Sequence, residues 1–228
     1  MPHKAAALAA IEDAANRRFP GRVALVSSFG TESAVLLHMA ARIDRALPIL
    51  FIDTGRLFGE TLAYRDALAR RRNLSNIRTV RPDFAALRVA DPRRARWADD
   101  PDRCCGVRKV APLRAALQDF DAWITGRKRG HGGQRAELPL EEFDGAHVKL
   151  NPLAAWSEAD VDAYFDAHEL PRHPLQRDGY ASVGCVTCTA RVDDGARARS
   201  GRWAGLEKTE CGSHWPADGG SPQRGGAA

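Results

Sequence analysis

Four of the five cysteines lie in two pairs whose spacing is typical of a metal centre. Cys104 and Cys105 are adjacent, and Cys185 and Cys188 are separated by two residues. A single C-x-x-C motif could bind zinc, exchange thiols or bind an iron–sulfur cluster. Structural zinc usually takes two spaced pairs, whereas adjacent thiolates more easily reach different irons of one cluster. The pattern therefore favours an iron–sulfur cluster over zinc and over four unligated core cysteines.

Cations are expected beside such a cluster, because four thiolates leave it with a net negative charge. Arg103, Arg108 and Lys109 flank the adjacent pair. Lys109 follows Cys105 by four residues, so a helix would place both side chains on one face. This arrangement favours a metal centre in a positive environment.

The fifth cysteine lies in a stretch with the composition of a flexible arm. From residue 193 onward glycine and arginine are frequent, and no hydrophobic period persists around Cys211. The thiolate is the nucleophilic form of cysteine, and the nearby cations Lys208 and His214 favour it, whereas Glu210 opposes it. The interpretation is a nucleophile on a mobile arm, and the alternative is an inert cysteine.

A loop of small hydroxyl residues and glycine is the candidate anion site. Residues 27–33 (SSFGTES) lie between a predicted strand at 21–27 and a predicted helix at 32–41. Free N–H groups at the start of a helix bind anions, although such a turn can also simply cap the helix. The loop lacks the Gly-Lys-Ser/Thr ending of a Walker motif. Residues 53–55 (DTG) follow the next strand, and ligands of open parallel sheets bind at the carboxyl ends of strands, which favours a nucleotide site.

Strands and helices are predicted to alternate along the chain. This pattern predicts an α/β fold, with a single open, mostly parallel sheet and flanking helices. Residues 1–192 are predicted to form the domain, and residues 193–228 a flexible C-terminal segment. The remaining predicted strands are 48–52, 77–80, 122–125 and 147–150, and the remaining helices are 60–72, 107–117 and 157–168.

Composition limits the class of protein and of ligand. The 228 residues carry a net charge of +5, and 29 of the 34 basic residues are arginine, which recognises phosphate and carboxylate through paired hydrogen bonds. This favours a polyanionic ligand, either a nucleotide or a nucleic acid. No apolar run approaches the roughly 20 residues of a membrane span, and the N-terminus lacks the pattern of a secretory signal. A cytoplasmic protein is therefore expected.

Together and in this order, the motifs resemble the assimilatory adenylyl-sulfate (APS) reductases, the iron–sulfur branch of the APS/PAPS reductase family, where PAPS is 3′-phospho-APS. The resemblance extends from about residue 19 to residue 214. Ser213 departs from it where relatives carry an aliphatic residue, and so does Gly130-His131, where they commonly carry an aromatic–Gln pair. The matching segments are 27–33, 53–58 (DTGRLF), 103–109 (RCCGVRK), 123–129 (WITGRKR), 151–153 (NPL), 179–185 (GYASVGC), 199–203 (RSGRW) and 208–212 (KTECG).

The resemblance implies an adenine nucleotide alpha hydrolase-like fold, a [4Fe–4S] cluster and one catalytic cysteine. The implied cluster ligands are Cys104, Cys105, Cys185 and Cys188, and the implied nucleophile is Cys211. The implied substrate contacts are Ser27, Ser28, Gly30, Thr31, Glu32, Ser33, Asp53, Lys109, Arg127, Arg129, Arg135, Arg199, Arg202 and His214.

The implied reaction is the thioredoxin-dependent reduction of APS to sulfite and AMP through an S-sulfocysteine, in assimilatory sulfate reduction. The expected partners are APS and thioredoxin or a similar dithiol, with no nucleic acid and no membrane. The alternatives are PAPS or dual specificity, an ATP-dependent thiolating enzyme of the pyrophosphatase-loop superfamily, and a nucleic-acid-binding regulator. Phe29 and Glu32 stand where ATP-using relatives carry glycine and aspartate, which argues against the thiolating enzyme.

Overall fold

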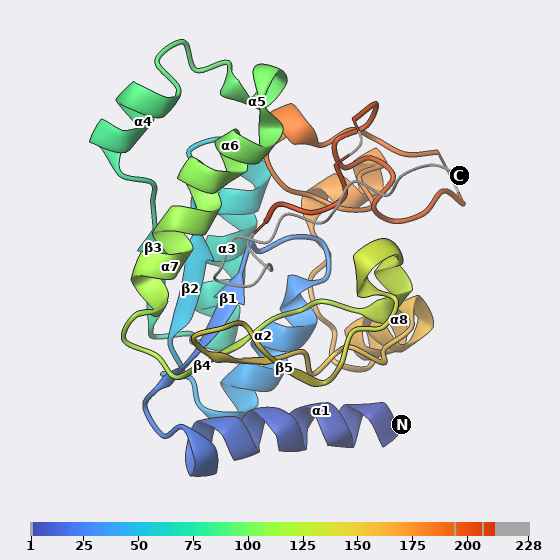
Figure 1. The fold of residues 1–228 in the computed structure, drawn as a ribbon. Coiled ribbons are helices and arrows are strands. Elements are labelled where there is room, and N and C mark those ends of the chain that lie inside the picture. The colour runs from blue at the N-terminus through green and yellow to red at the C-terminus, as the bar shows by residue number, and fades with distance from the viewer. Residues whose placement is uncertain (1, 194, 207, 213–228) are drawn as a thin grey trace.

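Six strands form one sheet in the computed structural model, which describes residues 2–193, 195–206 and 208–212 (Figure 1). The strands are β1 (Val23–Ser27), β2 (Ile49–Ile52), β3 (Ile77–Val80), β4 (Ala122–Ile124), β5 (Glu141–Phe143) and β6 (Val148–Leu150). Their order is β3-β2-β1-β4-β6-β5, and every neighbouring pair is parallel except β5 and β6. The predicted open, mostly parallel sheet is therefore confirmed.

The helices agree with the predicted alternation and add elements to it. The predicted helix at 157–168 is present, and Ser157 caps it together with Asp160. The α-helices are α1 (Pro2–Asp13), α2 (Ser33–Ile43), α3 (Gly59–Arg72), α4 (Phe84–Ala90), α5 (Arg96–Asp99), α6 (Pro101–Cys105), α7 (Ala111–Leu117) and α8 (Glu158–Ala167). The π- and 3-10-helical turns are η1 (Ala14–Arg18), η2 (Gly106–Val110), η3 (Arg129–His131), η4 (Gly133–Arg135), η5 (Pro174–Asp178) and η6 (Val186–Cys188).

Apolar side chains pack on both faces of the sheet. Along β1, Val23 and Leu25 join a core with Leu37 of α2 and residues of α1, α3 and α8. Ala24 points to the opposite face and packs in a second cluster that includes Leu113 of α7. Full burial of a leucine side chain stabilises a fold by about 1.5–3 kcal/mol. The two cores fix the sheet between the helices. Figure 1 shows the helices on either side of the sheet.

One helical run is interrupted where the sequence predicts an unbroken helix at 107–117. The π-helical turn η2 lies between α6 and α7 and carries Arg108 and Lys109. A π-turn inserts an extra residue into the helical repeat and so changes the direction of the side chains around it. Lys109 consequently faces the cavity described below.

Strand order determines where a ligand can bind. From β1 the chain runs outward through β2 to β3, and it later returns to the other side of β1 as β4. The loops that leave β1 and β4 therefore diverge, and such a divergence opens a crevice at the carboxyl ends of the strands.

The described part of the C-terminal segment packs against the rest of the protein. Arg202 forms an isolated bridge with Thr189, and the Trp203 amide donates to the Cys188 carbonyl at 3.1 Å. The division at residue 192 and the flexibility of the segment stay predictions. Within the described ranges, no helix has the length and apolar character needed to span a bilayer.

Candidate active site

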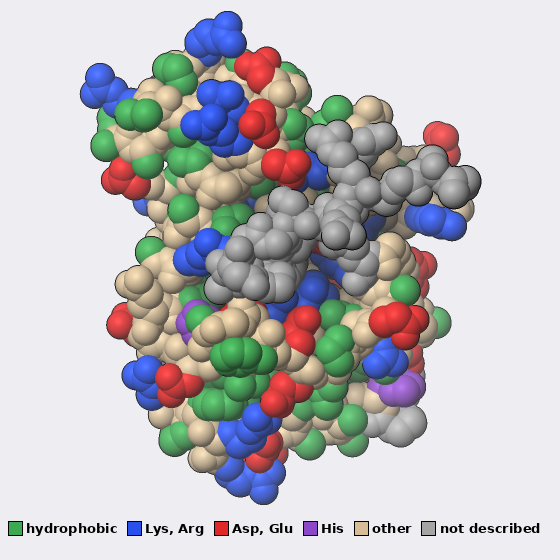
Figure 2. Space-filling model, viewed as in Figure 1, with side chains coloured by type: hydrophobic (Ala, Val, Ile, Leu, Met, Phe, Trp, Pro, Cys, Tyr) green, Lys and Arg blue, Asp and Glu red, His purple; other side chains and the backbone are tan. Residues whose placement is uncertain are grey.

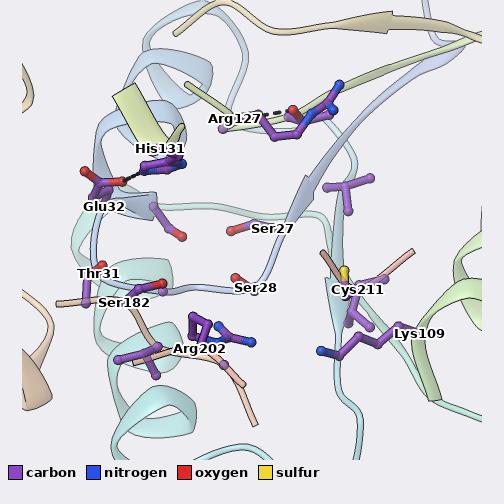
Figure 3. A pocket seen from close by; sticks show the side chains of 18 of the residues that line it. Ser27, Ser28, Thr31, Glu32, Lys109, Arg127, His131, Ser182, Arg202 and Cys211 are labelled. Carbon is purple, nitrogen blue, oxygen red and sulfur yellow. Dashed lines mark hydrogen bonds and ion pairs between the residues drawn. The ribbon is translucent and has the colours of Figure 1, made fainter. Parts of the chain in front are cut away.

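A cavity lies at the carboxyl ends of β1, β2 and β4, where the strand order predicts a crevice (Figure 3). The C-terminal segment forms part of its wall through Arg199, Arg202 and Cys211. In Figure 3, Cys211 and Lys109 lie on one side, and Thr31, Glu32 and His131 on the other. Twelve of the predicted site residues for substrate and catalysis line the cavity: Ser27, Ser28, Gly30, Thr31, Glu32, Ser33, Lys109, Arg127, Arg135, Arg199, Arg202 and Cys211.

Two predicted substrate contacts lie away from the cavity. Asp53 accepts hydrogen bonds from the Gly55 amide and from Arg81 Nε, both at 3.0 Å. Arg129 Nε donates to the Leu138 carbonyl at 2.8 Å. Both side chains stabilise local turns, and their contact with substrate stays a prediction. His214 lies outside the described residues.

The loop after β1 is held in its turn by a buried aromatic residue. Phe29 has a positive φ of 51°, which is unfavourable for a bulky side chain. Its ring is fully buried and packs edge-on against Phe51, with ring centres 5.4 Å apart. The Phe29 amide also donates to Ser27 Oγ at 3.1 Å. Core packing therefore offsets the backbone strain and leaves Ser28 and Gly30 beside the cavity.

Glu32 is ionised and already paired. Burial alone raises the pKa of Glu32, but its contacts with His131 and Lys128 outweigh burial and lower the pKa to about 2. His131 Nε2 lies 3.1 Å from Glu32 Oε2, and Lys128 Nζ pairs with the same oxygen. The carboxylate thus neutralises a buried lysine at the edge of the cavity.

Positive charge dominates the cavity wall. Burial and repulsion from Arg135 lower the pKa of Arg127 to about 10, and the same two effects lower that of Arg199 to about 10. Both guanidiniums remain charged at neutral pH. Among the described lining residues, five cations (Lys109, Arg127, Arg135, Arg199, Arg202) face two carboxylates (Glu32, Glu210). On the face shown in Figure 2, by contrast, basic and acidic side chains are intermixed. The cavity is therefore suited to a ligand with several negative charges.

Several of these cations lie around the indole ring of Trp203. Trp203 is buried, and its ring centre lies 4.8 Å from Arg202 Cζ and 5.9 Å from Arg199 Cζ. Lys208 Nζ and Lys109 Nζ lie 5.4 and 6.0 Å from the same ring. A cation near an aromatic face gains about 0.5–1 kcal/mol, and more where water is excluded. Trp203 thereby favours placing these charges beside the cavity.

Arg202 reaches the cavity across a glycine. A Cβ atom added to Gly184 would lie 2.2 Å from both terminal nitrogens of Arg202 and 2.3 Å from its Cζ. Arg202 Nε is buried without a hydrogen-bond partner among the described residues. The guanidinium therefore depends on the absence of a side chain at position 184.

The two cysteine pairs come together beside the cavity. All five cysteines are free thiols, and Cys104, Cys105 and Cys185 are buried. Burial raises the pKa of Cys104, and repulsion from Cys185 and Cys188 adds to the increase. Burial also raises the pKa of Cys105 to about 12, with smaller contributions from Cys185 and Cys211. Within the described residues, no three His, Cys, Asp or Glu side chains are arranged around a single metal ion.

A buried arginine and a partly buried lysine accompany these thiols. Arg108 Nη2 donates to Asp91 Oδ2 at 2.8 Å, and Arg108 Nη1 donates to the Thr54 carbonyl at 2.9 Å. Burial disfavours the charged form of Lys109, but the thiolate forms of Cys185, Cys211 and Cys105 raise its pKa overall. Lys109 therefore stays protonated between the paired cysteines and Cys211.

Sequence reasoning missed several residues of the site. His131, Ser182, Gly184, Trp203 and Glu210 all line the cavity. The sequence did mark position 131 as unusual, because Gly130-His131 departs from the pattern expected of relatives. The other four lie in the segments 179–185, 199–203 and 208–212 that carry the family resemblance, but they face the cavity through contacts between distant segments, which spacing along the chain does not reveal.

Comparisons with known proteins show the family of this chain. A family model described as the phosphoadenosine phosphosulfate reductase domain matches residues 22–191. An adenosine 5′-phosphosulfate reductase from Chelativorans sp. (strain BNC1) is 50% identical over 212 residues, covering 92% of this chain and 86% of that protein. One from Mycobacterium tuberculosis (strain ATCC 25177 / H37Ra) is 41% identical over 183 residues, covering 79% and 72%.

Solved structures share the fold. A phosphoadenylyl-sulfate (PAPS) reductase from Candida auris has a TM-score of 0.68 and 24% sequence identity, over 82% of this chain and 90% of that one. The FMN adenylyltransferase of Candida glabrata has a TM-score of 0.59 and 17% identity, over 86% and 70%. At these identities the likeness describes the arrangement of the chain and leaves the chemistry open.

Proposed function

This chain belongs to the phosphoadenosine phosphosulfate reductase family, and we propose that it reduces adenosine 5′-phosphosulfate (APS) to sulfite and AMP in assimilatory sulfate reduction. The observation that carries the proposal is that Cys211 lines the same cation-rich cavity as the loop at residues 27–33. A relative named adenosine 5′-phosphosulfate reductase, 50% identical over most of both chains, supports the choice of APS.

In the first step, the Cys211 thiolate attacks the electrophilic sulfur of the phosphosulfate group. A sulfur–sulfur bond forms, the bond from sulfur to the bridging oxygen breaks, and AMP leaves with that electron pair. Covalent catalysis of this kind replaces one difficult reduction by two exchange steps. Arg199, Arg202 and Lys109 are placed to offset charge on the sulfate and on the departing phosphate.

In the second step, a dithiol carrier, which we propose to be thioredoxin, attacks the sulfur of Cys211. Sulfite leaves, and a mixed disulfide joins the carrier to Cys211. The second thiol of the carrier then breaks this disulfide and restores the Cys211 thiolate. The carrier loses two electrons, which balances the reduction of sulfate to sulfite. Because this exchange and the five free thiols require a reducing environment, we place the reaction in the cytoplasm.

We also propose that Cys104, Cys105, Cys185 and Cys188 hold a [4Fe–4S] cluster. Four free thiols that approach one another beside Lys109 suit such a group, whose thiolates bind different irons and so are spaced more widely than the ligands of one ion. When bound, the cluster would supply negative charge beside the cavity and order the segments around it.

A single-turnover experiment tests the function. Anaerobically purified protein is mixed with APS, or with PAPS, in the absence of a carrier, and intact mass and released nucleotide are measured. We expect a gain of one SO3 and one equivalent of AMP with APS, and neither in Cys211→Ser. Formation of the same adduct from PAPS at an equal rate would show that the enzyme uses both substrates and does not prefer APS. AMP release without an adduct would contradict the mechanism.

The cluster proposal has its own measurement. Visible absorbance and iron content are expected to persist in Cys211→Ser and to be lost in Cys185→Ser. Iron retained by Cys185→Ser at the level of the parent protein would contradict the ligand assignment. Both variants replace one thiol by a hydroxyl. A difference in iron content between them therefore reports whether the replaced cysteine is a cluster ligand or the nucleophile.

A further inference from the structure

Four side chains form a continuous hydrogen-bonded chain from the loop after β1 to the residue that precedes Cys211. His131 Nε2 lies 3.1 Å from Glu32 Oε2, as the dashed line in Figure 3 marks. His131 Nδ1 lies 2.9 Å from Arg135 Nη1. Arg135 then donates to both carboxylate oxygens of Glu210, through Nε and, at 2.8 Å, through Nη2.

The direction of each hydrogen bond follows from the donors available. A guanidinium can only donate, so His131 Nδ1 must accept from Arg135. His131 Nε2 then carries the proton and donates to Glu32. The histidine is thus a neutral connector with a defined tautomer, and it orients Arg135 toward Glu210.

The contact at the end of this chain has the properties of a strong ion pair. Arg135 is 7% exposed and Glu210 is 8% exposed, and they meet through two parallel hydrogen bonds. Such paired, charge-assisted hydrogen bonds are about twice as strong as neutral ones. Arg199 adds to the attachment, since its Nη2 donates to the Thr209 carbonyl at 2.8 Å and lies 3.7 Å from Glu210 Oε2.

We propose that Glu210 is a positioning residue, and that its ion pair with Arg135 is a latch that holds Cys211 in the cavity. Arg135, which the sequence predicts to bind the substrate, also receives Glu210 in this latch. This inference rests on the proposed function, because it assigns the latch to the step in which Cys211 attacks. The exchange with the carrier needs an accessible sulfur, so the latch opens for the second step.

The kinetic test separates the two half-reactions. A hydrogen bond to a charged group contributes about 1.5–3 kcal/mol, so Glu210→Gln and Arg135→Gln should each slow single-turnover AMP release roughly ten- to hundredfold. Sulfite release from the preformed adduct by dithiothreitol should not slow. Since both variants remove the same contact, the double variant should be no slower than the slower single variant. Effects that multiply would overturn the proposal, because Arg135 would then act separately on the substrate.

A second test uses no substrate. Amide hydrogen exchange in the peptide covering 199–212 should be roughly ten- to hundredfold faster in Glu210→Gln than in the parent protein. The matched control is Glu141→Gln, which breaks the two-bond pair of Glu141 with Arg18 on the exposed surface and should leave this peptide unchanged. Unchanged exchange in Glu210→Gln would overturn the latch whatever the activity. Absence of AMP release from the parent protein would instead contradict the proposed function.

Discussion

Arg202 packs so closely against Gly184 that a single added methyl group, as in Gly184→Ala, should displace the guanidinium from the cavity. In Gly184→Ala, the new Cβ would lie 2.2 Å from both terminal nitrogens of Arg202, whereas side-chain Cβ atoms keep at least 3.0 Å from such neighbours. The guanidinium must therefore move by at least 0.8 Å, the difference between these two distances. Position 184 has no positive φ, so alanine strains no backbone there.

The size of the effect follows from the hydrogen bond to the anionic end of the substrate that we propose for Arg202 and that this variant would weaken. A hydrogen bond from a charged donor contributes about 1.5–3 kcal/mol, and each 1.36 kcal/mol is about a tenfold change in rate. We expect the second-order rate constant for single-turnover AMP release from APS to fall roughly ten- to hundredfold. The free energy of unfolding should change by less than about 1 kcal/mol, because the clash is with the free end of a flexible side chain.

The assay compares four proteins under single-turnover conditions: the parent, Gly184→Ala, Arg202→Ala and the double variant. Because both changes act through one guanidinium, the double variant should match Arg202→Ala. The control is Gly59→Ala at the start of α3, where a Cβ would meet nothing within 4 Å and activity should be unchanged. Full activity in Gly184→Ala, or additive losses in the double variant, would refute the reasoning.

Three other sets of buried or partly buried groups should respond to substitution or pH. Asp91→Asn leaves the buried Arg108 guanidinium without its charged partner, so the free energy of unfolding measured in urea should fall by about 3–5 kcal/mol. The pKa of Glu32 is about 2 in the folded protein against 4.5 as its reference, so the parent loses stability as pH falls from 4.5 toward 2, and Glu32→Gln should not show this loss. Burial lowers the pKa of His38 and His173 to about 4 from 6.5, so the unfolded chain takes up protons first and stability falls between pH 6.5 and 4. An NMR titration should give both midpoints near 4.

Each of these expectations has a contrary outcome. Asp121→Asn breaks an exposed ion pair with Arg22 and should leave the free energy of unfolding nearly unchanged, so an equally small loss in Asp91→Asn would contradict its burial argument. Equal acid losses in the parent and in Glu32→Gln would show that other groups govern that range. Histidine midpoints near 6.5 would show that water reaches both rings.

The sheet was predictable because its central strands are continuous apolar runs buried on both faces. Residues 49–52 are all buried, and the predicted segment 48–52 contains them. The edge strand β5 escaped prediction because its sequence, EEF, is short and charged. Such residues suit an exposed sheet edge but carry no apolar alternation. The π-turn at 106–110 was equally hidden, because its residues fit a regular helix and only packing alters the repeat.

The candidate site was predictable where chemistry is local in sequence. The loop at 27–33 and the paired cysteines are short motifs, and the structure brings the loop and Cys185 to the same cavity. The pairing of Arg135 with Glu210 was not predictable, because 75 residues separate them and many arginines compete for each carboxylate. The same holds for the contact of Gly184 with Arg202, which depends on how a side chain crosses the backbone.

The C-terminal segment contacts the rest of the protein at positions 184 and 135, and these contacts constrain how the sequence can diverge. Arg202 fits only against a residue without a side chain at position 184, and Glu210 needs a guanidinium at position 135. A C-terminal segment transplanted from a relative would therefore function only when the residues that receive it are transplanted too. Among relatives, a substitution at one of these positions is expected to occur together with a compensating substitution at the position it contacts.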